Sequence, residues 1–270
     1  MSDATRRDRR IRARDAKRVA ESLLRDGLPP GDDVAATVEL TRHLMEILGE
    51  RRDAHRASKA ARTAERVFEA SIRRTPGTLA VACRKGCAYC CTNFVAATIP
   101  EILALAARLR SDWPDETAPV YRRIEAAGHN PADFATADRS TLTAPCPVLG
   151  PDNLCAAYES RPLACRGFAS LDLDACIRAV TDMSVQIPNT KQRALFRSRC
   201  SMALWAALKA CGLSHRSYDL HHAISIAVSD RDAERRWLAG EDVFAGVQTD
   251  VSRRPEFETF VDQLIERASV

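Results

Sequence analysis

Four cysteines lie within nine residues of this chain, at a spacing that suits metal ligation. They are Cys83, Cys87, Cys90 and Cys91. Zinc sites and iron–sulfur clusters both need several thiolates at one point, and short spacings bring thiolates together at little cost in chain entropy. On a helix the four side chains would share one face, since each residue turns a helix by about 100°. If Gly86 instead forms a turn, the segment is a loop that grips the metal, and both geometries bring the sulfurs together.

A second set of four cysteines follows in a segment without sustained periodicity. The set consists of Cys146, Cys155, Cys165 and Cys176. Residues 129–176 are rich in Pro, Asp and Asn, and so long an irregular segment needs something other than secondary structure to hold it. Metal ligation can do this. We therefore expect the eight cysteines, called the motif cysteines below, to ligate metal in two four-thiolate sites. Buried unligated thiols and a disulfide framework are the weaker alternatives.

Basic residues stand between these cysteines. Eight thiolates around two divalent zinc ions would leave a charge of about −4, and such a charge must be offset in a low-dielectric interior. We expect Arg161 and Arg166 to donate to sulfur, with Arg84 and Lys85 as further candidates. Tyr158 lies one turn before Arg161, where it can order the arginine.

The pattern resembles a known family. Its residues are Cys83…Cys87-x-x-Cys90-Cys91 and Cys146-Pro…Cys155-x-x-Tyr158-x-x-Arg161-Pro162-x-x-Cys165-Arg166. These strings resemble the YkgJ-like cysteine-cluster family of zinc- or iron-chelating domains, over about residues 78–180. The resemblance implies that all eight motif cysteines are ligands, and that the cofactor is zinc or iron, a 4Fe–4S cluster included. It implies no settled reaction, although some relatives are associated with flagellin lysine methylation.

Three classes of function remain open on this evidence. The first is a zinc-stabilised interaction module whose helices bind a protein partner, since structural zinc sites are closed by four ligands. The second is an iron–sulfur redox or modifying enzyme, and the third is metal storage or delivery. The sequence contains no Gly-rich phosphate loop, dinucleotide fingerprint, His-Glu-x-x-His or serine nucleophile elbow. This weakens a methyltransferase interpretation, and the sequence does not decide whether the protein is an enzyme.

The remaining cysteines and the histidines carry weaker signals. Cys200 and Cys211 share a helix face with two leucines, which indicates core packing. For His215, His221 and His222 we expect structural roles, because the sequence places no acidic or thiol pattern beside them.

Composition indicates a soluble globular protein. Of 270 residues, 46% are hydrophobic and 28% are charged, with a net charge of +4. No apolar run reaches about 18 residues, so no membrane span is expected. The start of the chain lacks the apolar core of a secretory signal, and we expect a cytoplasmic protein with reduced thiols. Residues 1–20 hold eight Arg/Lys and three Asp, which predicts a solvated, partly disordered arm, with weak nucleic-acid contact as the alternative.

Periodicity predicts a mainly α fold in which helical segments surround a cysteine-rich, loop-rich metal-binding module. The expected organisation is a basic arm (1–18), an N-terminal helical segment (19–77), the cysteine module (78–180) and a C-terminal helical segment (181–270). Asp32 and Asp33 are expected to cap a helical stretch that runs to Arg74 and breaks at Gly49. Further helices are expected over 98–111, 117–127, 190–211, 217–229, 231–239 and 255–268. Thr98 and Glu101 form a capping box that should begin the first of these.

Overall fold

The computed structural model describes residues 3–31, 34–76, 81–129, 145–182, 184–247 and 255–270. Within these ranges the protein is mainly helical, as predicted, and a single two-stranded sheet completes the regular structure. The elements are α1 (Asp3–Asp26), α2 (Ala35–Gly49), α3 (Arg56–Arg74), η1 (Tyr89–Thr92), β1 (Ala96–Thr98), α4 (Ile99–Asp112), α5 (Pro119–His129), η3 (Tyr158–Ser160), α6 (Leu163–Gly167), α7 (Leu173–Ala179), α8 (Lys191–Ala210), β2 (Ser217–Asp219), α9 (Leu220–Ser229), α10 (Ala233–Leu238) and α11 (Pro255–Ser269).

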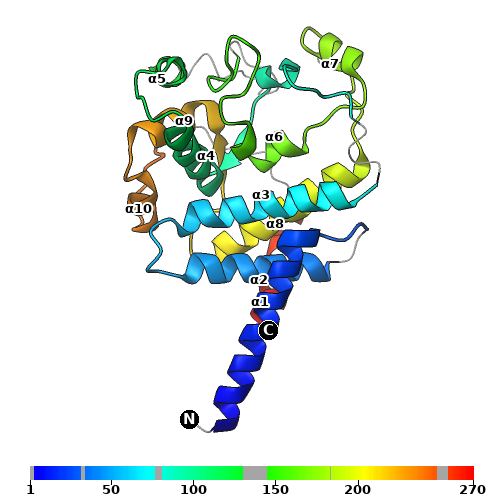
Figure 1. The fold of residues 1–270 in the computed structure, drawn as a ribbon, viewed down its shortest axis with the longest axis vertical. Helices are drawn as coiled ribbons and strands as arrows, with labels where there is room; N and C mark the ends of the chain where they lie inside the picture. The colour runs from blue at the N-terminus through cyan, green and yellow to red at the C-terminus, as the bar shows by residue number, and fades with distance from the viewer. Residues whose placement is uncertain (1–2, 32–33, 77–80, 130–144, 183, 248–254) are drawn as a thin grey trace.

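Three helices form the centre of the molecule. Figure 1 shows α2, α3 and α8 running side by side, with α4, α6 and α7 on one side of them and α1 projecting on the other. The helices pack because each carries a buried apolar stripe at a spacing of three or four residues, such as Leu40, Leu44 and Leu48 of α2. The buried face of α3 is rich in alanines, with Phe68 as its one aromatic member. The cysteine segments therefore rest on a rigid helical base.

The first helix is longer than expected. The basic arm, predicted to be partly disordered, belongs to the continuous helix α1. This expectation was wrong because closely spaced charges do not prevent helix formation when solvent screens them, and Arg and Ala are good helix formers. The helix ends where Gly27, at φ +75°, meets the backbone of Ser71 on α3. Leu28 N–H then donates to Ser71 Oγ at 2.8 Å.

Most helix boundaries agree with the prediction to within a few residues. The break at Gly49 separates α2 from α3, and the capping box of Thr98 and Glu101 begins α4. Asp32 and Asp33, which were expected to cap α2, lie outside the described residues, as do residues 130–144. No helix in the described ranges combines the length and apolar character needed to cross a bilayer.

A short antiparallel sheet joins two distant parts of the chain. β1 pairs with β2, with Ala96 opposite Asp219 and Thr98 opposite Ser217. The prediction placed a helix from 217 and included no sheet, because three-residue strands are too short to show alternation. This ladder holds the start of α9 against the segment that follows Cys90 and Cys91. It therefore positions residues from the C-terminal part of the chain beside the candidate site.

Candidate metal centre

The first four motif cysteines lie on a turn and not on a continuous helix. Gly86 has a φ of +83°, which favours glycine, and Cys87 N–H donates to Arg84 O at 3.0 Å. The 3₁₀ turn η1 follows and carries Cys90 and Cys91. Of the two geometries open from the sequence, the structure therefore has the gripping loop.

A backbone hydrogen bond brings the second set to the first. Cys146 N–H donates to Cys91 O at 2.7 Å. The chain then folds back on itself, with an antiparallel bridge between Leu149 and Cys155 and a hydrogen bond from Gly150 N–H to Leu154 O at 2.8 Å. Cys155 is thus returned to the side of Cys146, without a long regular element.

Cys165 lies on α6, and a buried carboxylate fixes this short helix. Glu101 Oε2 accepts hydrogen bonds from the Thr98 N–H at 2.8 Å and hydroxyl at 2.7 Å. Its Oε1 accepts a hydrogen bond at 2.9 Å from the N–H of Leu163, which is the first residue of α6. The capping box of α4 therefore also anchors the helix that carries Cys165, a function that the sequence pattern alone did not reveal.

Six of the motif cysteines line one cavity of about 740 Å³. They are Cys87, Cys90, Cys91, Cys146, Cys155 and Cys165. Arg84, Lys85, Arg161 and Arg197 also line this space. The structure thus brings cysteines from both sequence sets to a single cavity with several cationic neighbours.

The remaining two motif cysteines lie at one side of this group. Cys83 interacts electrostatically with Cys87, Cys90 and Cys176. Ser170 links its segment to the second set, because Ser170 N–H faces Cys83 Sγ at 3.4 Å and Ser170 O accepts from Ala82 N–H at 2.8 Å. Cys176 on α7 is therefore a neighbour of Cys83.

The two sequence sets are not two spatial groups. Cys91, from the first set, interacts with Cys146 and Cys155 of the second, whereas Cys176 of the second set lies beside Cys83 of the first. Cys90 interacts with Cys83 and also with Cys155. Grouping the motif cysteines by their order in the chain would assign them to the wrong neighbours.

Burial and mutual repulsion set the protonation of the thiols. Burial raises the pKa of Cys155 to about 11 and also raises the pKa values of Cys165 and Cys83. A hydrogen bond with Cys91 lowers the pKa of Cys90 and raises that of Cys91, and Arg161 also lowers the pKa of Cys90. Most of these thiols are thus protonated without a metal, and metal binding would release their protons.

The two arginines of the sequence motif face different ways. Arg161 interacts with Cys90, Cys155 and Cys165. Its guanidinium lies 3.6 Å from the ring centroid of Tyr158, and its Nε donates to Tyr158 O at 3.0 Å. Tyr158 therefore orders Arg161 through ring and backbone.

Arg166 turns instead toward α3. It forms an ion pair with Glu69 at 2.7 Å, its Nη2 lies 3.5 Å from Glu65 Oε2, and its Nε donates to Arg161 O at 2.6 Å. The Arg166 guanidinium thus contacts carboxyl groups and backbone carbonyls, where the sequence prediction had it donating to sulfur.

The donor set suits zinc or iron, although its geometry is not that of a completed site. In the described part of the chain, no three Cys, His, Asp or Glu side chains already form a metal-binding group. The chemistry nevertheless fits, since thiolate sulfur is the donor that zinc and iron–sulfur clusters share. Binding would draw neighbouring thiols together, as expected where metal binding and folding are coupled.

One residue beside the cysteines was missed by the sequence reasoning. His221, at the start of α9, is fully buried, and its Nδ1 lies 3.1 Å from Asp219 Oδ1. Its ring also faces the Cys146 thiol. Burial lowers the pKa of His221, but Cys146 and Asp219 raise it more, to about 9. The Asp-x-His spacing of residues 219–221 was the signal in the sequence that could have indicated this histidine. The thiol that it faces comes from a distant segment, so the sequence did not show the contact.

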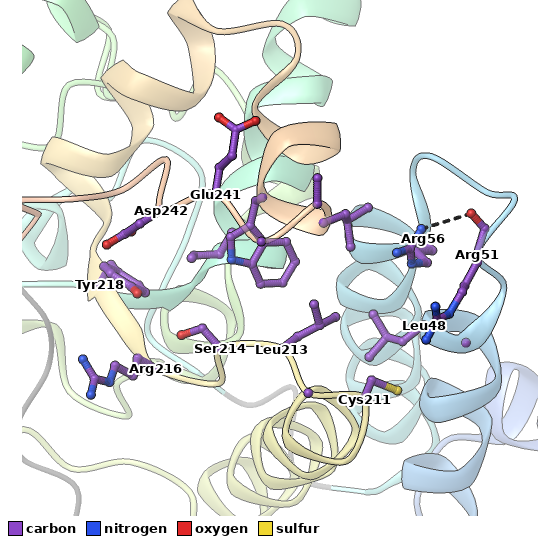
Figure 2. Close-up of a pocket in the computed structure, with 17 residues that line it drawn as sticks. Leu48, Arg51, Arg56, Cys211, Leu213, Ser214, Arg216, Tyr218, Glu241 and Asp242 are labelled. Atoms are coloured by element: carbon purple, nitrogen blue, oxygen red, sulfur yellow. Dashed lines mark hydrogen bonds between the residues drawn. The ribbon is translucent and has the colours of Figure 1, made fainter.

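The other cysteines and histidines lie elsewhere. Cys200 is fully buried in the core of α8. Cys211 is half-buried and lines a second cavity of about 660 Å³, whose lining includes none of the motif cysteines. Figure 2 shows it near Leu48 and Leu213. His215 Nε2 lies 3.2 Å from Glu258.

Residues 82–201 match the family model CxxCxxCC, described as a putative zinc- or iron-chelating domain. This match confirms the resemblance drawn from the cysteine strings, since the YkgJ-like proteins belong to that family. It also extends the related region to α8. No curated protein and no solved structure matches the chain.

Proposed function

We propose, from the zinc- or iron-chelating domain that residues 82–201 carry, that this protein binds zinc or iron through all eight motif cysteines. The single observation that carries the proposal is the convergence of six of these cysteines on one cavity, with Cys83 and Cys176 beside it. Unligated core cysteines have no reason to face a cavity together, because free thiols normally pack singly among apolar side chains.

Charge compensation supports this proposal. Each thiolate that binds metal adds negative charge to a poorly solvated space, and that charge is costly without a partner. Arg161 supplies one, since it interacts with three of the motif cysteines and Tyr158 holds its guanidinium in place. Arg84, Lys85 and Arg197 on the same cavity supply further positive charge.

The position of Cys90 favours a centre with more than one metal ion. Cys90 interacts with Cys83 and also with Cys155 and Cys165. A thiolate between two ligand groups can bridge two metal ions, whereas two independent mononuclear sites would need separate ligand sets. A polynuclear thiolate centre, either zinc or iron–sulfur, is therefore the second and finer part of the proposal. When bound, an iron–sulfur cluster would supply electron transfer, and zinc would supply a structural cross-link.

Metal analysis after anaerobic purification tests the proposal. Absorption spectroscopy and mass-spectrometric metal determination should find either about four iron ions per chain with a visible chromophore, or about two zinc ions without one. Either result supports chelation and identifies the metal. A stably folded chain that contains neither metal, and takes up neither on reconstitution, would overturn it.

Matched cysteine variants separate ligation from packing. Cys90→Ser and Cys165→Ser should lower the metal content, because each removes a thiolate that faces the cavity. Cys211→Ser is the control, since Cys211 is a half-buried thiol outside the cysteine group. Equal metal content in all three variants would contradict the ligand assignment.

A further inference from the structure

We propose that His221 is a nitrogen ligand of the metal that Cys146 binds. The inference rests on the proposed chelation function and adds a donor that lies outside the matched domain of residues 82–201. His221 is fully buried, and the β1–β2 ladder together with the hydrogen bond from Leu220 N–H to Val95 O at 3.0 Å holds it beside the cysteine segment.

The hydrogen bonds of the imidazole select the correct tautomer for ligation. Nδ1 lies 3.1 Å from Asp219 Oδ1, and Asp219 is itself held by its cap on the His221 backbone N–H at 3.0 Å. With the proton on Nδ1, the Nε2 lone pair is the donor on the opposite side of the ring. A ligating histidine typically donates its other N–H to a carboxylate in this manner. Asp219 therefore acts as a positioning residue that orients the ring.

The imidazole also interacts with the Cys146 thiol. Binding replaces the thiol proton with the metal and passes that proton to solvent, so charge and atoms balance. Cys155 and Cys165 each interact most strongly, among the cysteines, with Cys146. These three thiolates and His221 make up a Cys₃His donor set, which is an established zinc combination.

Cadmium NMR on the full-length chain tests this ligand directly. The reduced, metal-free protein is loaded with ¹¹³Cd²⁺, which takes the same sulfur and nitrogen donors as zinc, and ¹H–¹¹³Cd correlations are recorded. We expect one cadmium resonance to couple through the metal–nitrogen bond to the ring protons of a single histidine. This coupling should disappear in His221→Ala and persist in His222→Ala, whose side chain lies on the next residue of α9.

Two further variants distinguish ligation from hydrogen bonding and from a purely structural role. His221→Cys supplies another ligand, so it should retain full cadmium stoichiometry with that resonance shifted to an all-sulfur position. His221→Gln can donate a hydrogen bond but is a poor ligand, so it should bind cadmium at this site no better than the alanine variant does. Asp219→Asn should keep the coupling and lower metal affinity by about 10- to 100-fold, as expected for a positioning residue.

The wild-type spectrum alone can overturn the inference, whether or not the variants fold. Cadmium bound without coupling to any histidine would refute the His221 ligand and leave chelation by cysteine intact. Coupling to a histidine other than His221 would refute it equally. A chain that binds no cadmium would refute the proposed function and this inference together.

Discussion

The buried carboxyl of Glu65 makes the stability of the protein depend on pH in a specific direction. Glu65 is 3% exposed on α3, and its Oε1 has no hydrogen-bond partner among the described residues. Burial raises its pKa to about 8, against the opposing effect of Arg166. The other charged groups that act on it are Glu101, Arg62 and Glu69. The carboxyl is therefore protonated in the folded protein at neutral pH.

A raised pKa stabilises the fold only while the group holds its proton. The stabilisation is fully present below the unfolded value of 4.5 and is lost as pH rises through about 8. At about 1.4 kcal/mol per pH unit, this group lowers the free energy of unfolding by about 5 kcal/mol across that window. Glu65→Gln copies the neutral carboxyl and cannot ionise. The variant should match the wild type at acidic pH and exceed its stability by up to about 5 kcal/mol above pH 8.

Urea denaturation of both proteins between about pH 5 and about pH 9 measures this difference. Other titrating groups, the thiols included, cancel because they are common to the two chains, provided that both are metal-free and reduced. Glu46→Gln removes the same charge from an exposed position on α2 and should show no such trend. A stability difference between Glu65→Gln and wild type that stays constant with pH would refute the reasoning.

Three other perturbations test the packing of the helices and the support of the cysteine segments. Gly27→Ala should cost at least about 3 kcal/mol of stability in thermal unfolding, because the new Cβ would lie 2.2 Å from the Ser71 nitrogen at a positive φ. Gly31→Ala, also at positive φ but in open space, should cost only about 1 kcal/mol, and equal losses would contradict the clash. Glu101→Gln weakens charge-assisted hydrogen bonds to two amides and a hydroxyl, so a loss of about 2–4 kcal/mol by chemical denaturation is expected. Removal of the metal by a chelator should increase proteolysis within residues 145–176 by at least about tenfold, and unchanged cleavage would show that metal does not hold this segment.

The sequence predicted the helices well because their signals are local. Apolar spacing, the capping box at Thr98 and the break at Gly49 each act within a few residues, and the structure agrees with them. The prediction of a partly disordered basic arm was wrong because charge density was given more weight than helix propensity. The β1–β2 pairing was not predicted, because three-residue strands show no periodicity and the two strands are far apart in the chain.

The candidate site shows the same limit. The cysteine strings identified the chemistry, but nothing in their spacing revealed that Cys176 would lie beside Cys83 and Cys91 beside Cys146. Those neighbours follow from long-range backbone contacts, such as the hydrogen bond from Cys146 to Cys91. His221 was given a structural role because its thiol neighbour comes from another segment. Sequence order thus determines donor type, whereas the tertiary fold determines which donors meet.

The two arginines of the motif explain how a nearly irregular segment becomes part of a helical protein. Arg161 and Arg166 are separated by the Pro162 turn and the start of α6, so they leave the backbone in different directions. Arg161 faces the thiols, while Arg166 reaches the carboxylates of α3 and the backbone carbonyls that precede α6. Losing the contacts of Arg166 would release α6 from the helical base, and Cys165 would move with it. The geometry of the cysteine group therefore depends on the ion pair between Arg166 and Glu69, so substitution of Glu69 should alter metal retention as well as stability.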